Sequence, residues 1–93
     1  MSSVLNENEI EKALNELDNW NFKDDKINKE FSFSDFREAV AFLVRLSFEA
    51  EDHGHHPEIF NVYNTVKISL STHDAGDKVT DKDIKLAKAI DTL

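Results

Sequence analysis

Hydrophobic residues recur at helical spacing in three stretches of the chain, residues 5–17, 34–51 and 80–93. In the first stretch, Ile10, Leu14 and Leu17 fall on one face of a helix. Each stretch begins at or near a residue that favours the N-cap position, and these residues are Asn6, Ser34 and Thr80. Glu9 lies three residues after Asn6, and Asp83 lies three residues after Thr80. This is the spacing of a capping box. The pattern therefore predicts three amphipathic helices.

Residues 19–33 alternate instead between apolar and polar residues, as a half-buried strand does. We interpret this stretch as a hairpin whose turn is the polar segment from Lys23 to Lys26. One face of its second strand carries three apolar side chains, those of Ile27, Phe31 and Phe33. Lys29 lies on the same face and breaks the pattern.

A second hairpin is predicted over residues 58–73. Its later strand alternates polar residues with three apolar ones, Val66, Ile68 and Leu70. If the pleat continues, His73 lies on the polar face.

The predicted order of elements is α-β-β-α-β-β-α. Two hairpins make one four-stranded antiparallel sheet, and three amphipathic helices can cover one of its faces. We therefore predict an α+β fold with two layers, in a single domain over residues 1–93. Phe42 and Phe48 lie off the centre of the apolar stripe of the middle helix, where they widen the buried face or form a subunit contact.

The chain has 93 residues, a formal net charge of −8 and no cysteine. This charge argues against direct binding to nucleic acid, which needs a cationic surface, and against an anionic membrane. A neutral small molecule or a protein partner stays open. Residues 1–20 show no export signal and no apolar run is long enough to span a bilayer, so we expect a cytoplasmic location.

Three of the four histidines, His53, His55 and His56, lie within four positions in front of Pro57. The middle helix should end near Glu51, because Gly54 is a natural stop signal. Adjacent residues of an extended segment point to opposite sides, so His55 and His56 would reach different surfaces unless the loop twists them together.

Imidazole gives and takes protons near neutral pH, so these histidines could act as general acids and bases. They could equally be surface residues that cap a helix. A metal-dependent hydrolase built on His53, His55 and His73 is a weaker hypothesis. Helical zinc motifs space their histidines four residues apart, and this spacing is absent here. We therefore expect no metal.

The histidine segment and its surroundings resemble the signature of the pterin-4a-carbinolamine dehydratases. That signature has an acidic residue, three residues, His-His-Pro, an aromatic residue after five more, a His nine residues beyond, and an Asp after a loop. Here it is filled by Glu51, His55-His56-Pro57, Tyr63, His73 and Asp83. The resemblance covers nearly the whole chain.

The resemblance implies a dehydratase that converts a 4a-hydroxytetrahydropterin to quinonoid dihydropterin and water in tetrahydrobiopterin recycling. It implies that His55, His56 and His73 handle the protons, and we favour His56 as the main acid–base group. Three further residues would bind pterin or support the site: Glu51, Asp83 and Pro57. Tyr63 is expected to be a packing residue. Pterin is the substrate, so no separate cofactor is expected.

The resemblance also implies a homodimer or homotetramer, formed by sheet-edge pairing or by helix packing. A different reading is a non-catalytic binding module. Animal relatives serve as dimerisation cofactors of a homeodomain transcription factor, and other relatives act on or escort molybdopterin-related pterins. An exposed apolar helix surface would mark a protein partner, although the sequence itself shows none.

Overall fold

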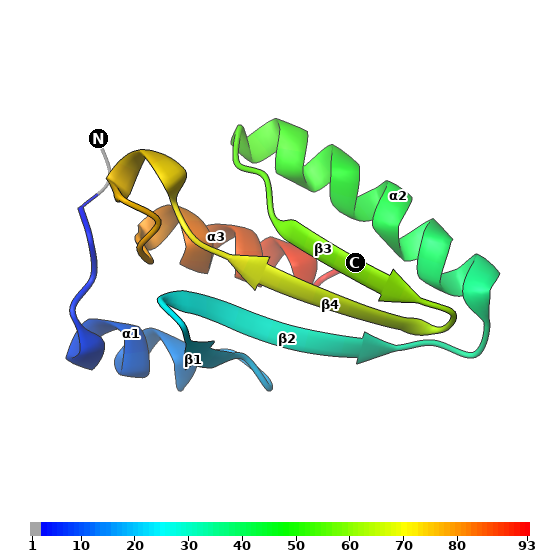
Figure 1. The fold of residues 1–93 in the computed structure, drawn as a ribbon, viewed down its shortest axis with the longest axis horizontal. Helices are drawn as coiled ribbons and strands as arrows, with labels where there is room; N and C mark the ends of the chain where they lie inside the picture. Colours follow the sequence, from blue (N-terminus) through cyan, green and yellow to red (C-terminus); the bar gives the residue numbers. More distant parts are fainter. Residues whose placement is uncertain (1–2) are drawn as a thin grey trace.

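The computed structural model describes residues 3–93. The helices are α1 (Glu7–Leu14), α2 (Phe36–His53) and α3 (Asp81–Ile90), and a short 3-10 helix, η1 (His73–Ala75), precedes α3. The strands are β1 (Asn21–Lys23), β2 (Lys26–Ser32), β3 (Glu58–Val62) and β4 (Thr65–Leu70). The predicted order of three helices and four strands is confirmed, with η1 as an addition (Figure 1).

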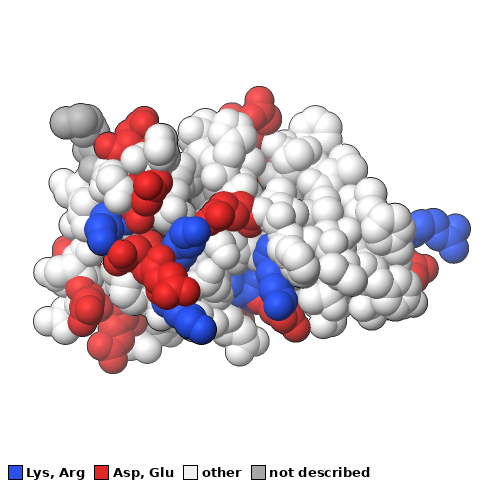
Figure 2. Space-filling view, viewed as in Figure 1, with Lys and Arg blue, Asp and Glu red and all other residues white. Residues whose placement is uncertain are grey.

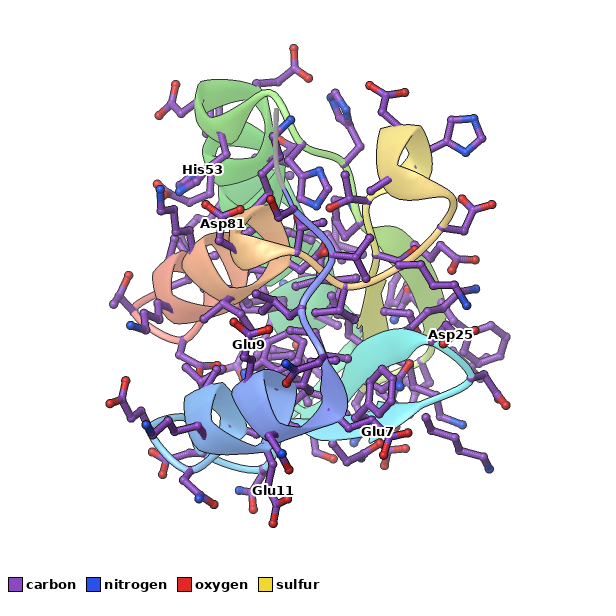
Figure 3. All side chains as sticks on the ribbon, turned by 90° about the vertical axis from the view of Figure 1, so that its left-hand side faces the viewer. Glu7, Glu9, Glu11, Asp25, His53 and Asp81 are labelled. Carbon is purple, nitrogen blue, oxygen red and sulfur yellow. The ribbon has the colours of Figure 1, made fainter. Side chains whose placement is uncertain are left out.

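The four strands form one antiparallel sheet in the order β1-β2-β4-β3. The register pairs Ile68 of β4 with Lys29 of β2 and with Ile59 of β3, so these side chains share one face. All three helices lie on that face, as Figure 3 shows with helices on the left and strands on the right. The predicted α+β fold is therefore confirmed, and β1 and β3 are the two edges of the sheet.

Two short turns close the hairpins. Asp24 and Asp25 both have positive φ, 55° and 61°, which suits a tight two-residue turn where the sequence predicts it. Tyr63 also has positive φ, 50°, in the turn between β3 and β4. Its side chain is 61% exposed, so the prediction of a packing residue is wrong. A turn position at a hairpin tip projects the ring away from the core.

The caps of α1 and α3 agree with the sequence. Asn6 accepts a hydrogen bond from the Glu9 amide at 2.8 Å, and the Glu9 carboxylate accepts one from the Asn6 amide at 2.9 Å. Thr80 and Asp83 form the equivalent capping box of α3. Both pairs satisfy amides that a helix leaves unpaired at its start.

The ends of α2 differ from the prediction by one or two residues. Asp35, not Ser34, is the N-cap, because its carboxylate accepts the Glu38 amide at 2.8 Å. The helix continues to His53 and ends at Gly54, which has a φ of 58°. Glycine adopts that left-handed conformation without steric cost, so it stops the helix two residues later than expected.

The interruption at Lys29 is explained by the end of α3. The Lys29 ammonium contacts the Asp91 carboxylate at 2.8 Å and lies over the rings of Trp20 and Phe31. The indole N–H of Trp20 donates to the same carboxylate, at 2.9 and 3.1 Å from its two oxygens. A charged residue is thus accommodated beside the core because it has a charged partner.

One side of α2 faces the core and another is exposed. Phe42 is buried, so it widens the buried face, whereas Phe48 is 67% exposed. With three other exposed residues it forms what we call the outer α2 stripe: Phe36, Val40, Val44 and Phe48. Figure 2 shows few charged side chains over the right-hand half of the molecule, where α2 begins and the β3–β4 turn lies. Within residues 3–93, none of the helices combines the length and apolar character that a membrane span requires.

Candidate active site

Two adjoining hollows lie where the loop after α2, the end of β4 and η1 meet. Their volumes are about 390 and 230 Å³, and both are lined by His56, Ser71 and His73. The larger also has Lys26, Glu58, Ser69 and Asp77 in its wall, and the smaller has Gly54, His55, Thr72, Asp74 and Lys82. The structure thus places His55, His56 and His73 around one continuous region.

A larger hollow of about 500 Å³ lies between α1 and β1. Its wall is mostly apolar and amide side chains, and Glu7 and Glu11 are its titratable groups (Figure 3). It contains no imidazole to exchange protons near neutral pH. The histidine-lined hollows are therefore the better candidate site.

His55 forms the buried part of the site. Its Nε2 contacts Oδ1 of Asp83 at 2.5 Å, and the Asp83 side chain is fully buried. The other oxygen, Oδ2, accepts from the Thr72 hydroxyl at 2.9 Å and from the Thr80 amide at 2.8 Å. Two donors hold Oδ2 in place, so the carboxylate presents Oδ1 to His55 and can orient its ring.

His56 has an exposed partner instead. Its Nε2 contacts the Glu51 carboxylate at 2.5 Å, and its side chain is 67% exposed. His55 and His56 therefore differ in exposure and in partner, but both line the smaller hollow, so the loop brings them together rather than to different surfaces. Pro57 is half-buried just before β3 and is outside both walls.

His73 occupies η1 rather than a continued strand, because β4 ends at Leu70. Its Nδ1 contacts the Asp77 carboxylate at 2.9 Å. This hydrogen bond, and then the charges of Asp77 and Asp74, raise the pKa of His73 above its ordinary value. His73 is therefore protonated to a higher pH than a free imidazole would be.

The three histidines share one arrangement. Each has one ring nitrogen on a carboxylate and, within residues 3–93, no hydrogen bond to the other nitrogen. None of the described side-chain nitrogen and oxygen atoms is both buried and without a partner. Nδ1 of the largely buried His55 therefore keeps contact with solvent, and each histidine has one nitrogen available to a bound molecule.

His53 is apart from this group. Its Nδ1 contacts the Glu49 carbonyl at 2.9 Å, and Figure 3 shows it on the side of α2 away from η1. In the described part of the chain, no three His, Asp or Glu side chains are grouped to share a metal ion. The geometry thus gives no support to a metal site built on His53, His55 and His73.

Sequence reasoning missed several residues of the site. Thr72 donates to Asp83, the partner of His55, Asp77 is itself the partner of His73, and Lys82 lines the smaller hollow. Their only signal is proximity, since Thr72 directly precedes His73 and Asp77 is four residues after it.

Comparison with known proteins gives the family. Residues 3–93 match the family described as Pterin 4 alpha carbinolamine dehydratase. Relatives from Opitutus terrae and Christiangramia forsetii are 45% and 46% identical over 93 residues, covering 100% of this chain and 96% and 95% of theirs. Both are named "Putative pterin-4-alpha-carbinolamine dehydratase". The chain belongs to the pterin-4-alpha-carbinolamine dehydratase family, which takes its name from a hydro-lyase reaction.

Two solved structures are similar. A transcriptional coactivator/pterin dehydratase from Brucella melitensis has a TM-score of 0.91 and 39% identity, covering 97% of both chains. A pterin dehydratase-like protein identified as a RuBisCO assembly factor in the alpha-carboxysome has a TM-score of 0.63 and 26% identity, covering 78% of this chain and 83% of that one. The two similar structures are thus described as a transcriptional coactivator/pterin dehydratase and as an assembly factor.

Proposed function

We propose that this chain dehydrates a 4a-hydroxytetrahydropterin to quinonoid dihydropterin and water by general acid–base catalysis. In the reaction the C4a–O bond breaks, and the departing hydroxyl takes a proton to become water. The N5–H bond loses its proton, and its electron pair forms the N5=C4a double bond. One proton is given and one is taken, so a pair of imidazoles can perform both steps.

The observation that carries this proposal is the set of three carboxylate-bound histidines, each with one available nitrogen. We assign the acid to His73, because Asp77 and Asp74 raise its pKa and so favour the protonated ring. We assign the base to Nδ1 of His55, because Asp83 binds its Nε2 and leaves Nδ1 to accept a proton. His56 and Glu51 would bind the pterin, in place of the leading role that the sequence favoured for His56.

The hollows suit a small polar bicyclic ring. The volume of the larger one, about 390 Å³, falls in the range of small-molecule sites, and the smaller one adjoins it. The Ser71 side chain lines both hollows. Lys82 and Asp74 add charges of both signs to the smaller one. The cytoplasmic location expected from the sequence stays part of this proposal.

The test is dehydration of the 4a-carbinolamine, followed optically, with the substrate generated by a phenylalanine hydroxylase and the spontaneous rate subtracted. We expect His55→Ala and His73→Ala each to lower kcat by about 10²–10⁴-fold, as for other general acids and bases. His53→Ala is the matched control, because His53 is outside both hollows. No acceleration by the wild type would overturn the proposal, and full activity in a histidine variant would overturn that residue's role.

A second candidate function is protein binding, and the outer α2 stripe favours it. The helix that carries the stripe, α2, runs alongside β3 (Figure 1), which pairs only with β4 among the described strands. Ile59 of β3 is exposed and lies on the helix side of the sheet, opposite Ile68. An edge strand offers unpaired backbone groups to another strand. We propose that a second copy of this chain occupies this surface, because two antiparallel β3 strands related by a two-fold axis would also bring the two stripes together.

Light scattering after size exclusion tests the oligomer. We expect a wild-type dimer or tetramer, and a smaller species for Phe48→Glu, which places a charge in the apolar contact. Leu93→Glu is the control, since Leu93 is an exposed apolar residue outside the surface. A monomeric wild type would contradict self-association and favour a different protein partner.

A further inference from the structure

Thr72 lies at the back of the site, between β4 and η1, and is 4% exposed. Its hydroxyl donates to Oδ2 of Asp83 at 2.9 Å and is 2.6 Å from the Thr80 hydroxyl. Its hydroxyl is thus engaged by Asp83 and Thr80, and it reaches His55 through the carboxylate of Asp83.

The donors and acceptors of this network can be assigned by counting the protons that each hydroxyl group can donate. A threonine hydroxyl has one proton, and Thr72 gives its proton to the carboxylate of Asp83. Thr80 must then be the donor in its contact with Thr72. The Thr80 oxygen in turn accepts from the Lys82 amide at 3.3 Å. The chain of donors runs from Thr80 through Thr72 to Asp83.

This assignment fixes the state of His55. Oδ2 of Asp83 is occupied by the Thr72 hydroxyl and the Thr80 amide, so Oδ1 faces Nε2 of His55. An ionised Asp83 carboxylate has no proton to donate, so Nε2 of His55 must carry the proton in this contact. Nδ1 is then the nitrogen with the free lone pair.

We infer that Thr72 is a positioning residue, which locks the Asp83 carboxylate so that His55 keeps its proton on Nε2 and presents Nδ1 as a base. The kinetic consequence rests on the proposed dehydratase function, whereas the tautomer does not. The backbone of Thr72 is held independently, because its amide donates to the Lys78 carbonyl at 2.8 Å and its carbonyl accepts from the Asp77 amide at 3.1 Å. Loss of the hydroxyl therefore leaves the loop in place.

The experiment compares Thr72→Val, which keeps the shape and removes the hydroxyl, with Thr72→Ser, which restores it. Thr65→Val is the matched control, a half-buried threonine of β4 outside both hollows. The ¹⁵N shifts of the imidazole nitrogens report the tautomer, with His55 assigned by the signals that His55→Ala removes. They are recorded across a pH range that includes the neutral ring.

We expect the wild type and Thr72→Ser to show His55 protonated on Nε2, and Thr72→Val to show a mixture of tautomers. We expect kcat of Thr72→Val to fall about tenfold with KM unchanged, since one hydrogen bond to a charged group is lost. A wild-type ring protonated on Nδ1 would overturn the inference, and so would a folded Thr72→Val with the wild-type tautomer. A wild type with the expected tautomer but no dehydration would overturn the proposed function alone.

Discussion

Replacing Asp91 with alanine should destabilise the fold, because this carboxylate serves two side chains that face the core. It accepts from the indole of Trp20 and pairs with the ammonium of Lys29. The indole is 6% exposed, and the Lys29 side chain is 13% exposed. Neither donor can recover a full hydration shell after Asp91 is removed.

The magnitude follows from what each donor loses. An unsatisfied buried donor costs about 1–3 kcal/mol. The unpaired Lys29 ammonium adds less to the loss of stability than a fully buried charge would, because the Asp91 side chain beside it is 20% exposed. We expect a loss of about 2–4 kcal/mol, a large share of the roughly 5–15 kcal/mol that stabilises a domain. Lys29→Met should cost only about 0.5–1.5 kcal/mol, since the stem still covers the rings of Trp20 and Phe31.

Urea unfolding followed by circular dichroism gives these free energies, and the fluorescence of Trp20, the sole tryptophan, reports its own environment. Lys29→Met combined with Asp91→Ala should cost about 1 kcal/mol less than the separate losses added together, because the double variant has no unpaired ammonium. Lys88→Met is the control, from an exposed pair with Glu16 at 3.8 Å, and should cost under about 1 kcal/mol. Additive losses, or an Asp91 variant as stable as this control, would refute the reasoning.

Two further predictions concern the site. Asp83→Asn should lower kcat by about 10³–10⁴-fold, since an amide that donates to His55 favours the other tautomer, and cost about 1.5–3 kcal/mol of stability. Parallel dehydration and unfolding measurements check it, and an active variant would contradict the orienting role of this carboxylate. Asp77→Asn should move the alkaline limb of the pH–rate profile to lower pH, because Asp77 raises the pKa of His73 and the general acid must be protonated. An unmoved limb in the rate profile would exclude His73 as that acid.

Much of the fold follows from local chemistry in the sequence. The capping boxes at Asn6 and Thr80 were predictable because each depends on residues three positions apart. Ser34 was wrong as a cap because serine and the following Asp35 both suit the position, and only the backbone decides between them. The position of Lys29 on an apolar strand face could not be explained from the sequence, because its partner Asp91 lies at the other end of the chain.

Some residues of the site could likewise be predicted from the sequence and others could not. A family signature brought His55, His56 and His73 together, and the structure places them around the same hollows. Thr72 and Asp77 could not be found from the sequence, because a hydroxyl and a carboxylate in a polar loop resemble ordinary surface residues. Their roles arise from a fold that brings β4, η1 and α3 to one point.

Asp83 is both the third residue of α3 and the partner of His55. When the first turn of α3 opens, the Thr80 amide loses its acceptor and His55 loses its orienting group in the same event. Amide hydrogen exchange measures the free energy of such local opening. The exchange rate of the Thr80 amide should therefore report, without substrate, the fraction of molecules whose site is assembled.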